Sequence, residues 1–131
     1  MASVAELDVP TLDSPAVRVL IESALAYAGG THTVADVEDA ITRGDAQLWT
    51  GPNSCIVTEI DRQPRHSILC FWLTAGVSSE LEAMEPGVVE WGKSEGCDRA
   101  RLVGRKGWER SFLPSHGWFN IGHVIMEREI K

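Results

Sequence analysis

The stretch that decides the fold reads ILCFWL and occupies residues 68–73. Every side chain in it is apolar, so both faces of a strand built from it need cover, as in a central strand with helices on either side of its sheet. Two shorter strand-like runs precede it, over residues 46–50 and 54–60, and turns containing polar residues or glycine and proline separate the runs. We therefore predict three consecutive antiparallel strands, with the last, over residues 66–73, in the middle of the sheet.

Two short helices are expected before these strands. Ser14 followed by Pro15 is a typical helix start, because proline fits the first helical position. Apolar residues spaced three and four apart follow as far as Ala28. Gly29 and Gly30 then allow the left-handed backbone that ends many helices.

A second helix is expected from Thr33, whose hydroxyl can cap the first turn together with Asp36. Its apolar residues face inward, and it stops at Gly44. Before both helices, residues 4–9 have the composition of a short opening strand. The chain is thus expected to open with one strand and two packed helices.

After the central strand, a third helix is predicted with Ser78 or Ser79 as its cap. Its apolar residues face the core, and Pro86 with Gly87 is expected to kink or split it. The remaining predicted elements are a strand over residues 99–103, a short helix around residues 108–112 and a last strand over residues 121–130.

This order of elements predicts an α/β fold of the α+β type, a mixed, mostly antiparallel central sheet flanked by helices on both faces. The crossover helix makes the two strands that flank it parallel. A length of 131 residues, with 44% hydrophobic and 24% charged residues, indicates a single globular domain over residues 1–131. The three cysteines form no CxxC motif and are expected to be reduced core thiols.

The formal net charge of −7 disfavours binding to nucleic acid, because a negative field repels the phosphate backbone. The apolar runs are shorter than the ~20 residues that a membrane span needs, and the first ten residues lack the layout of a signal peptide. We therefore expect no nucleic-acid or membrane partner and a cytoplasmic location.

Several short motifs resemble the GNAT acetyltransferase superfamily. Residues 90–97 read EWGKSEGC and residues 116–118 read HGW, similar to the runs W-A-x-x-x-G-C and L-G-F of that superfamily. Residues 28–33, 47–49 and 104–108 look like segments of short acetyltransferase-like proteins of tailed bacteriophages. The resemblance implies a GNAT-like fold, acetyl-coenzyme A as the cofactor of any enzymatic activity, and a place in the host cytoplasm or in the virion.

The loop that would hold coenzyme A departs from the pattern of this superfamily. There, a Q/R-x-x-G-x-G/A signature grips the pyrophosphate through backbone N–H groups. Here residues 73–78 read LTAGVS, and the acidic Glu80, Glu82 and Glu85 follow, where they repel phosphate. A plain capped turn is the alternative interpretation. If the cofactor binds, the residues expected to hold it are Thr74, Ala75, Gly76, Ser78, Ser79, Arg105 and Lys106.

Few side chains are candidates for proton transfer. Leu113 stands where the superfamily often has a tyrosine, four residues before the glycine of L-G-F. Glu59 is a candidate general base with His66 as a relay, and His116 is a candidate for the missing acid. A solvated strand end and an ordinary turn also account for Glu59 and His116. The histidines show no metal-site spacing, so no metal is expected.

A basic cluster interrupts the acidic chain over residues 99–110. It is either an anion site next to flanking glycines or a solvated face. Tryptophans beside arginines also make strong contacts at protein interfaces. The expected partner-binding residues are Arg105, Lys106, Trp108, Arg110 and Trp118.

The sequence thus predicts a GNAT-like, phage-type domain with a degenerate coenzyme A site, which acts without a cofactor as a non-catalytic binding or virion-associated structural module. Its partner is expected to be a protein such as a virion component, while its oligomeric state is left open. The alternative is an active acyl-CoA-dependent N-acetyltransferase. An enzyme needs an open slot between the two parallel strands, whereas a structural module can fill that slot with Trp72, Trp91 or Phe112.

Overall fold

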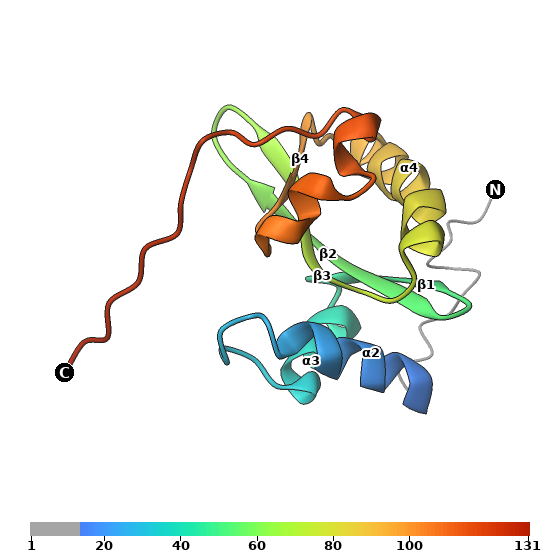
Figure 1. Ribbon diagram of the computed structural model, residues 1–131, viewed down its shortest axis with the longest axis vertical. Coiled ribbons are helices and arrows are strands. Elements are labelled where there is room, and N and C mark those ends of the chain that lie inside the picture. Colours follow the sequence, from blue (N-terminus) through green and yellow to red (C-terminus); the bar gives the residue numbers. More distant parts are fainter. Residues whose placement is uncertain (1–13) are drawn as a thin grey trace.

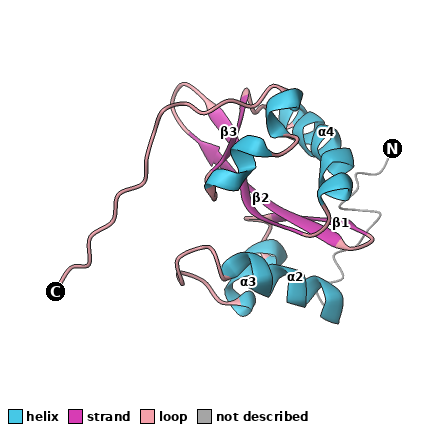
Figure 2. Ribbon diagram, viewed as in Figure 1, coloured by secondary structure: helices cyan, strands magenta, loops and turns pink. Residues whose placement is uncertain are grey.

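Helices cover both faces of a four-stranded sheet in the computed structural model, which describes residues 14–131 (Figure 1 and Figure 2). The strands lie side by side in chain order, as β1 (Gln47–Gly51), β2 (Ser54–Arg62), β3 (Ser67–Ala75) and β4 (Arg99–Leu102). The first three are antiparallel neighbours, and β4 is parallel to β3. The predicted sheet is confirmed, with β3 between two other strands. The strand expected over residues 4–9 lies outside the described residues.

Two helices, α2 (Pro15–Leu25) and α3 (Val34–Thr42), cover one face of this sheet, below it in Figure 1. Their apolar side chains form one core with strand residues that include Leu48, Val57 and Leu73. Each helix is too short to be stable alone, so this packing provides most of its stability.

The ends of these helices follow the sequence signals closely. The Thr33 hydroxyl accepts a hydrogen bond from the Asp36 N–H at 3.3 Å, and the Asp36 carboxylate accepts one from the Thr33 N–H at 2.8 Å. The predicted capping box is therefore confirmed. The helix α2 ends at Leu25, earlier than the glycine pair, and a turn connects it to Gly29 and Gly30, whose φ angles of 78° and 72° are left-handed.

The crossover helix α4 (Ser78–Ser94) covers the opposite face of the sheet. Leu81 and Val88 are buried on its inner side, and the side chains of Met84 and Trp91 pack around them. The predicted inward face of this helix is confirmed. Along the chain it connects β3 to β4, and this crossover explains why the two neighbouring strands are parallel.

Two details of α4 differ from the prediction. The capping residue is Val77, not a serine, and its N–H donates a hydrogen bond to the Ser54 hydroxyl of β2 at 2.9 Å. The helix also continues through Pro86 without being split. Pro86 and Glu82, whose carbonyl loses its helical partner, are both exposed, so water can satisfy that carbonyl.

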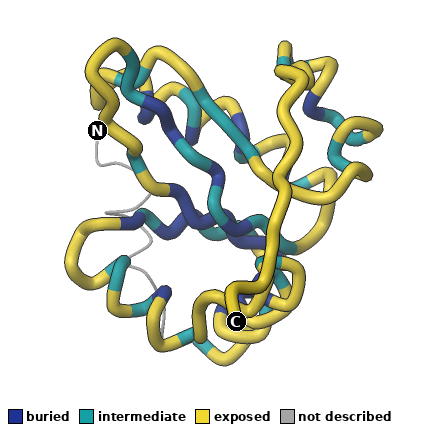
Figure 3. The backbone as a smooth tube through the Cα atoms, turned by 90° about the vertical axis from the view of Figure 1, so that its left-hand side faces the viewer, coloured by how far each residue is buried: buried dark blue, intermediate teal, exposed yellow. Residues whose placement is uncertain are grey.

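Beyond β4, the predicted short helix appears as two 3-10 turns, η1 (Lys106–Arg110) and η2 (Leu113–His116). The strand predicted over residues 121–130 is wrong, because these residues pair with no strand of the described chain. They lead away from the body (Figure 1) and are exposed throughout (Figure 3). Alternating apolar residues favour a strand, but a strand also needs a neighbour. We call residues 119–131 the exposed segment.

The three cysteines are free thiols. Burial raises the pKa of Cys55 to about 11, so this thiol is un-ionised near neutral pH. Among the residues that the structure describes, no helix has both the length and the apolar character to cross a membrane.

Candidate functional site

The most distinctive feature of the sheet is a bulge in β3 at Trp72. Val57 of β2 lies opposite Leu73, while the next residue, Thr58, lies opposite Phe71, so Trp72 has no partner on this side. The pairing with β4 ends at Phe71 and Leu102, so Trp72 has no partner there either. Bulges of this kind are common beside active sites, because they redirect backbone groups and side chains.

Beyond the last pair, β3 continues and β4 does not, which leaves a slot between them. The slot is a cavity of about 80 Å³. Its wall comes from the end of α2 with the turn after it, from the bulged part of β3, and from the chain that follows β4. The lining residues are Ala24, Tyr27, Ala28, Phe71, Trp72, Leu73, Thr74, Leu102, Val103, Gly104, Arg105 and Trp108.

Two contacts narrow the mouth of this slot. Trp108 packs so closely on Gly104 that an added Cβ there would lie 2.8 Å from the indole Cδ1. The Arg105 guanidinium lies over the ring of Tyr27, 4.0 Å from its centroid, in a cation–π contact. Sequence reasoning named other residues to fill the slot and missed the Arg105–Tyr27 contact, because it joins segments far apart in the chain.

Of the residues expected to fill the slot, only Trp72 lines it. Its indole also contacts the ring of His32, at 4.9 Å between centroids. Trp91 instead packs edge-on against Trp49, and Phe112 lies against His116. The expectation for Trp91 and Phe112 is therefore wrong, because both belong to the core under α4.

The slot also contains an unsatisfied polar group. The hydroxyl oxygen of Thr74 is fully buried and has no hydrogen-bond partner in the described part of the chain. Buried hydroxyls are nearly always bonded, and leaving one unpaired costs about 1–3 kcal/mol. Within residues 14–131 it is the one buried side-chain oxygen or nitrogen without a hydrogen-bond partner.

The loop between β3 and α4 is organised around Ser54. Gly76 has a φ of +128°, and an added Cβ would lie 2.4 Å from the Ser54 Cα. The Ser54 hydroxyl accepts a hydrogen bond from the Val77 N–H and donates one to the Glu80 carboxylate, at 2.7 Å. The predicted cofactor ligand Gly76 thus has a structural explanation, since it lets β2 approach the loop.

Glu80 gives this loop a negative charge. Its carboxylate accepts hydrogen bonds from the Ser54 hydroxyl, from the Asn53 N–H at 2.8 Å and from the Asn53 side chain at 3.3 Å. These bonds lower the pKa of Glu80, the Ser54 hydroxyl contributing most. An ionised carboxylate at the start of α4 satisfies the helix dipole and repels a phosphate.

The other residues expected at the cofactor site are less constrained. Ala75 lies at the end of β3, opposite Cys55. Ser78 and Ser79 are exposed in the first turn of α4, and their N–H groups meet no acceptor within residues 14–131. Arg105 lines the slot, whereas Lys106 is exposed in η1.

The proposed relay between Glu59 and His66 is not formed. Glu59 is exposed on β2, opposite Cys70. His66 instead pairs with Asp98, with 2.6 Å between Nδ1 and Oδ2. This bond lowers the pKa of Asp98. Neither Glu59 nor His66 lines the slot.

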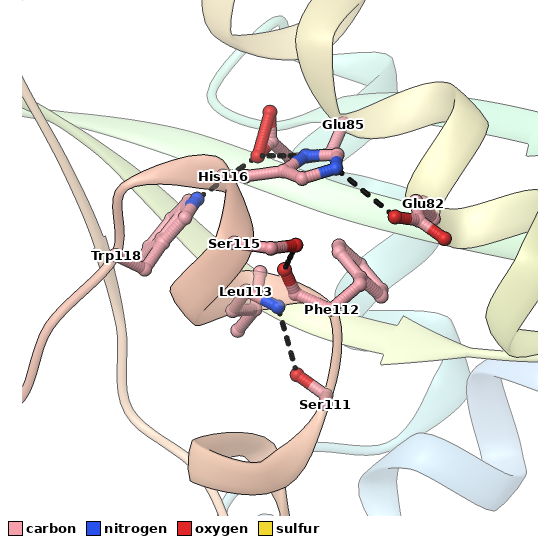
Figure 4. A network of polar contacts seen from close by, with 8 residues as sticks. All are labelled: Glu82, Glu85, Ser111, Phe112, Leu113, Ser115, His116 and Trp118. Atoms are coloured by element: carbon pink, nitrogen blue, oxygen red, sulfur yellow. Dashed lines mark hydrogen bonds and ion pairs between the residues drawn. The ribbon is translucent and has the colours of Figure 1, made fainter.

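His116 belongs to a polar network that joins η2 to α4 (Figure 4). Its Nδ1 lies 3.1 Å from the carboxylate of Glu85, and its Nε2 lies 3.2 Å from that of Glu82. Glu85 is buried and also accepts a hydrogen bond from the Trp118 indole N–H at 3.0 Å. The network fastens the chain after β4 to the crossover helix, and none of Glu82, Glu85, His116 and Trp118 lines the slot.

A sequence signal for this network existed in the spacing of α4. Glu85 follows Leu81 by four residues and precedes Val88 by three, so it lies on the apolar face of the helix. A carboxylate on a buried face needs a partner. Its partner, His116, is 31 residues away, so the pair could not be identified from spacing alone.

The predicted partner surface divides into two kinds of residue. Arg105, Lys106 and Arg110 are exposed. Trp108 and Trp118 are half-buried and pack into the core under α4, where Trp118 contacts Phe71 edge-on at 5.3 Å. The charges thus face solvent, while the tryptophans mainly anchor the 3-10 turns. Within the described range, no group of three or more His, Cys, Asp or Glu side chains has an arrangement that could hold a metal ion.

The structure has a mixed, mostly antiparallel sheet with helices on both faces and a crossover helix to a parallel strand. This α/β architecture is the predicted fold class and is consistent with a GNAT-like fold. No family model matches the chain, and neither does any curated protein sequence. Similar solved structures do exist, and the likeness to them is one of fold.

Two such structures are of TTHA1254 from the bacterium Thermus thermophilus. The wild-type crystal structure has a TM-score of 0.58 and the structure of a point mutant 0.59, both at 14% identity and over 92% of this chain. The matches extend over 90% and 91% of the length of the two Thermus chains. An acetyltransferase from Trypanosoma brucei gives a TM-score of 0.48 at 14% identity, over 87% of this chain and 92% of its own.

Proposed function

We propose that this protein is a non-catalytic binding module built on a GNAT-like fold whose acyl-coenzyme A slot is closed. The observation that carries the proposal is the size of the slot, about 80 Å³, against the roughly 300–1,000 Å³ typical of small-molecule sites. Trp108 on Gly104 and Arg105 on Tyr27 occupy the space that a ligand would need.

The loop before α4 supports the same conclusion. Coenzyme A carries a pyrophosphate, which needs free N–H groups and no nearby negative charge. Here the Val77 N–H is already bonded to Ser54. The N–H groups of Ser78 and Ser79 have no acceptor in the described chain, but the ionised Glu80 follows them in the same first turn of α4, where it repels a phosphate. The residues present do not fit the cofactor, so the module is proposed to act without one.

The binding surface that we propose is the exposed basic group formed by Arg105, Lys106 and Arg110. Its position in an otherwise acidic chain suits an acidic protein partner, because opposite charges steer and orient association. The resemblance of the sequence to phage proteins favours a virion component as that partner. The net charge of −7 argues against nucleic acid.

Titration calorimetry with acetyl-coenzyme A tests the closed slot directly. We expect no binding by the wild-type protein. Micromolar binding that weakens about tenfold in Arg105→Ala, but not in the control Arg110→Ala, would overturn the proposal. Arg110 is a suitable control because it is equally charged and exposed but does not line the slot.

A second candidate function, acyl-CoA-dependent N-acetyl transfer, is favoured by one observation. It is the unpaired, buried hydroxyl of Thr74, a residue that lines the slot next to the bulge at Trp72. This function requires Trp108 to move off Gly104 and open the slot. If acetyl-coenzyme A raises the melting temperature of Trp108→Ala but not that of Trp108→Ala/Thr74→Val, the slot retains the capacity for an acyl ligand, and an acceptor screen is justified.

A further inference from the structure

The exposed segment carries several large apolar side chains that the fold leaves uncovered. Phe119, Val124, Ile125, Met126 and Ile130 are between 74% and 93% exposed. Exposed apolar runs of this kind mark interaction sites in stable proteins. The segment extends away from the body of the molecule (Figure 1), and the described part of the chain leaves it exposed (Figure 3).

The sheet has a free edge that such a segment can join. The strand β4 pairs with β3 on one side, and no described strand lies on its other side. Unpaired backbone N–H and C=O groups along an edge strand are a template for another strand. Edge addition by an extended segment is a common mode of protein recognition.

The charges at this edge are unusual. Arg99 and Arg101 of β4, together with Arg65 and His66, line a cavity of about 260 Å³ whose wall includes Ile68. In the described part of the chain, none of the three arginines forms an ion pair with a carboxylate. Asp98 pairs with His66, so within residues 14–131 the three arginines of this site remain without a carboxylate partner.

The exposed segment has the complementary pattern. Side chains two residues apart lie on the same face of a strand. Glu127 and Glu129 thus share one face of the segment, at the spacing of Arg99 and Arg101 on β4. The opposite face carries Met126, Arg128 and Ile130, and its two apolar side chains can extend the apolar side of β4 formed by Ala100 and Leu102. Both of these strand residues pack against the core under α4.

We infer that the exposed segment of one copy of this chain binds as an added strand along β4 of a second copy, with Glu127 and Glu129 against Arg99 and Arg101. The exchange is reciprocal, because each copy carries one segment and one free edge, which gives a closed twofold dimer. The Glu127/Glu129 face of the segment and the arginine-lined edge complement one another within this single sequence, so a second copy is the partner that fits. This inference does not depend on the proposed binding function.

Two charge-reversed variants of the full chain test the exchange. One is Glu127→Arg/Glu129→Arg, and the other is Arg99→Glu/Arg101→Glu. Each variant alone places like charges opposite one another in both contacts, so we expect its dimer dissociation constant to rise about tenfold or more. When the two variants are mixed, a heterodimer is expected to form. In one of its contacts, the unchanged segment of the Arg99→Glu/Arg101→Glu copy meets the unchanged β4 edge of the other copy. In the second contact both parts are reversed, so opposite charges meet again.

Sedimentation velocity at low salt provides the measurement, and circular dichroism verifies that each variant is folded. The control Glu22→Arg/Glu90→Arg makes the same charge change at exposed helix positions and should leave the dimer intact. A wild-type protein that is monomeric throughout would overturn the inference. So would a dimer that survives both reversals unchanged, or a mixture of the two variants that stays monomeric.

Discussion

The strand β3 has two different sides. Toward β2, pairing runs from Ser67 to Ala75 with a single bulge, and the polar side chains at this junction are bonded. Toward β4, pairing ends at Phe71, the hydroxyl of Thr74 has no partner in the described chain, and the arginines of the edge form no ion pair there. The comparison teaches that the β2 side holds the fold together, while the β4 side holds the groups that remain available for binding.

The largest effect is expected where β2 meets the loop after β3. In Gly76→Ala, the new Cβ clashes with the Ser54 backbone and the φ of +128° is strained, so the free energy of unfolding should fall by about 3–5 kcal/mol. Urea denaturation measures the change. The control Gly87→Ala lies in α4 with nothing within 4 Å of the added Cβ, and it should gain about 0.5–1 kcal/mol. Similar losses in both variants would contradict this account of the junction.

The next largest effect is expected in the network that fastens the 3-10 turns to α4. Glu85→Ala leaves the indole N–H of Trp118 and one nitrogen of His116 without an acceptor, so stability should fall by about 2–3 kcal/mol. Glu82→Ala removes a more exposed partner of His116 and should cost less than about 1 kcal/mol. Thermal or urea denaturation measures both changes. If the two variants lose the same unfolding free energy, Glu85 does not anchor the network more strongly than Glu82.

The elements of the fold differ in how far they could be predicted from the sequence. The sheet order and the capping box were predictable, because each depends on neighbouring residues or on simple periodicity. The bulge at Trp72 was not, because a run that is apolar on both faces hides a change of register. The unpaired state of residues 121–130 was also missed, since alternation indicates strand propensity but not whether a neighbouring strand is present.

The candidate site was predictable only in part. The acidic start of α4 and the short loop before it pointed to a poor phosphate site, and the lowered pKa of Glu80 supports that interpretation. The contact of Arg105 with Tyr27, which narrows the slot, joins distant segments and could not be derived from spacing. The pairing of His66 with Asp98 in place of Glu59 depends in the same way on how β3 and β4 meet.

A matched pair of threonines sharpens the contrast between the two sides of β3. On the β2 side, the buried hydroxyl of Thr58 donates to the Gln47 side chain at 2.8 Å and accepts from the Trp49 indole at 3.1 Å. Thr58→Val should therefore cost about 1–3 kcal/mol of unfolding free energy. Thr74→Val removes an unpaired hydroxyl and should be neutral or stabilising by up to about 1 kcal/mol. If both substitutions destabilise the protein alike, Thr74 has a partner in solution.

The smallest effect is a pH dependence on the β2 side. The Ser54 hydroxyl and the Asn53 N–H lower the pKa of Glu80 from its ordinary value of 4.5, so they favour the ionised form in the folded state. The stability that Glu80 contributes is then fully present above pH 4.5 and is lost as the pH falls through the lowered value. Urea midpoints of the wild type and Glu80→Gln should differ most near about pH 6 and converge in acid. Glu90→Gln removes a charge from an exposed site on the same helix and controls for net charge. If the difference in urea midpoint between the wild type and Glu80→Gln does not vary with pH, the Ser54 bond does not hold the carboxylate.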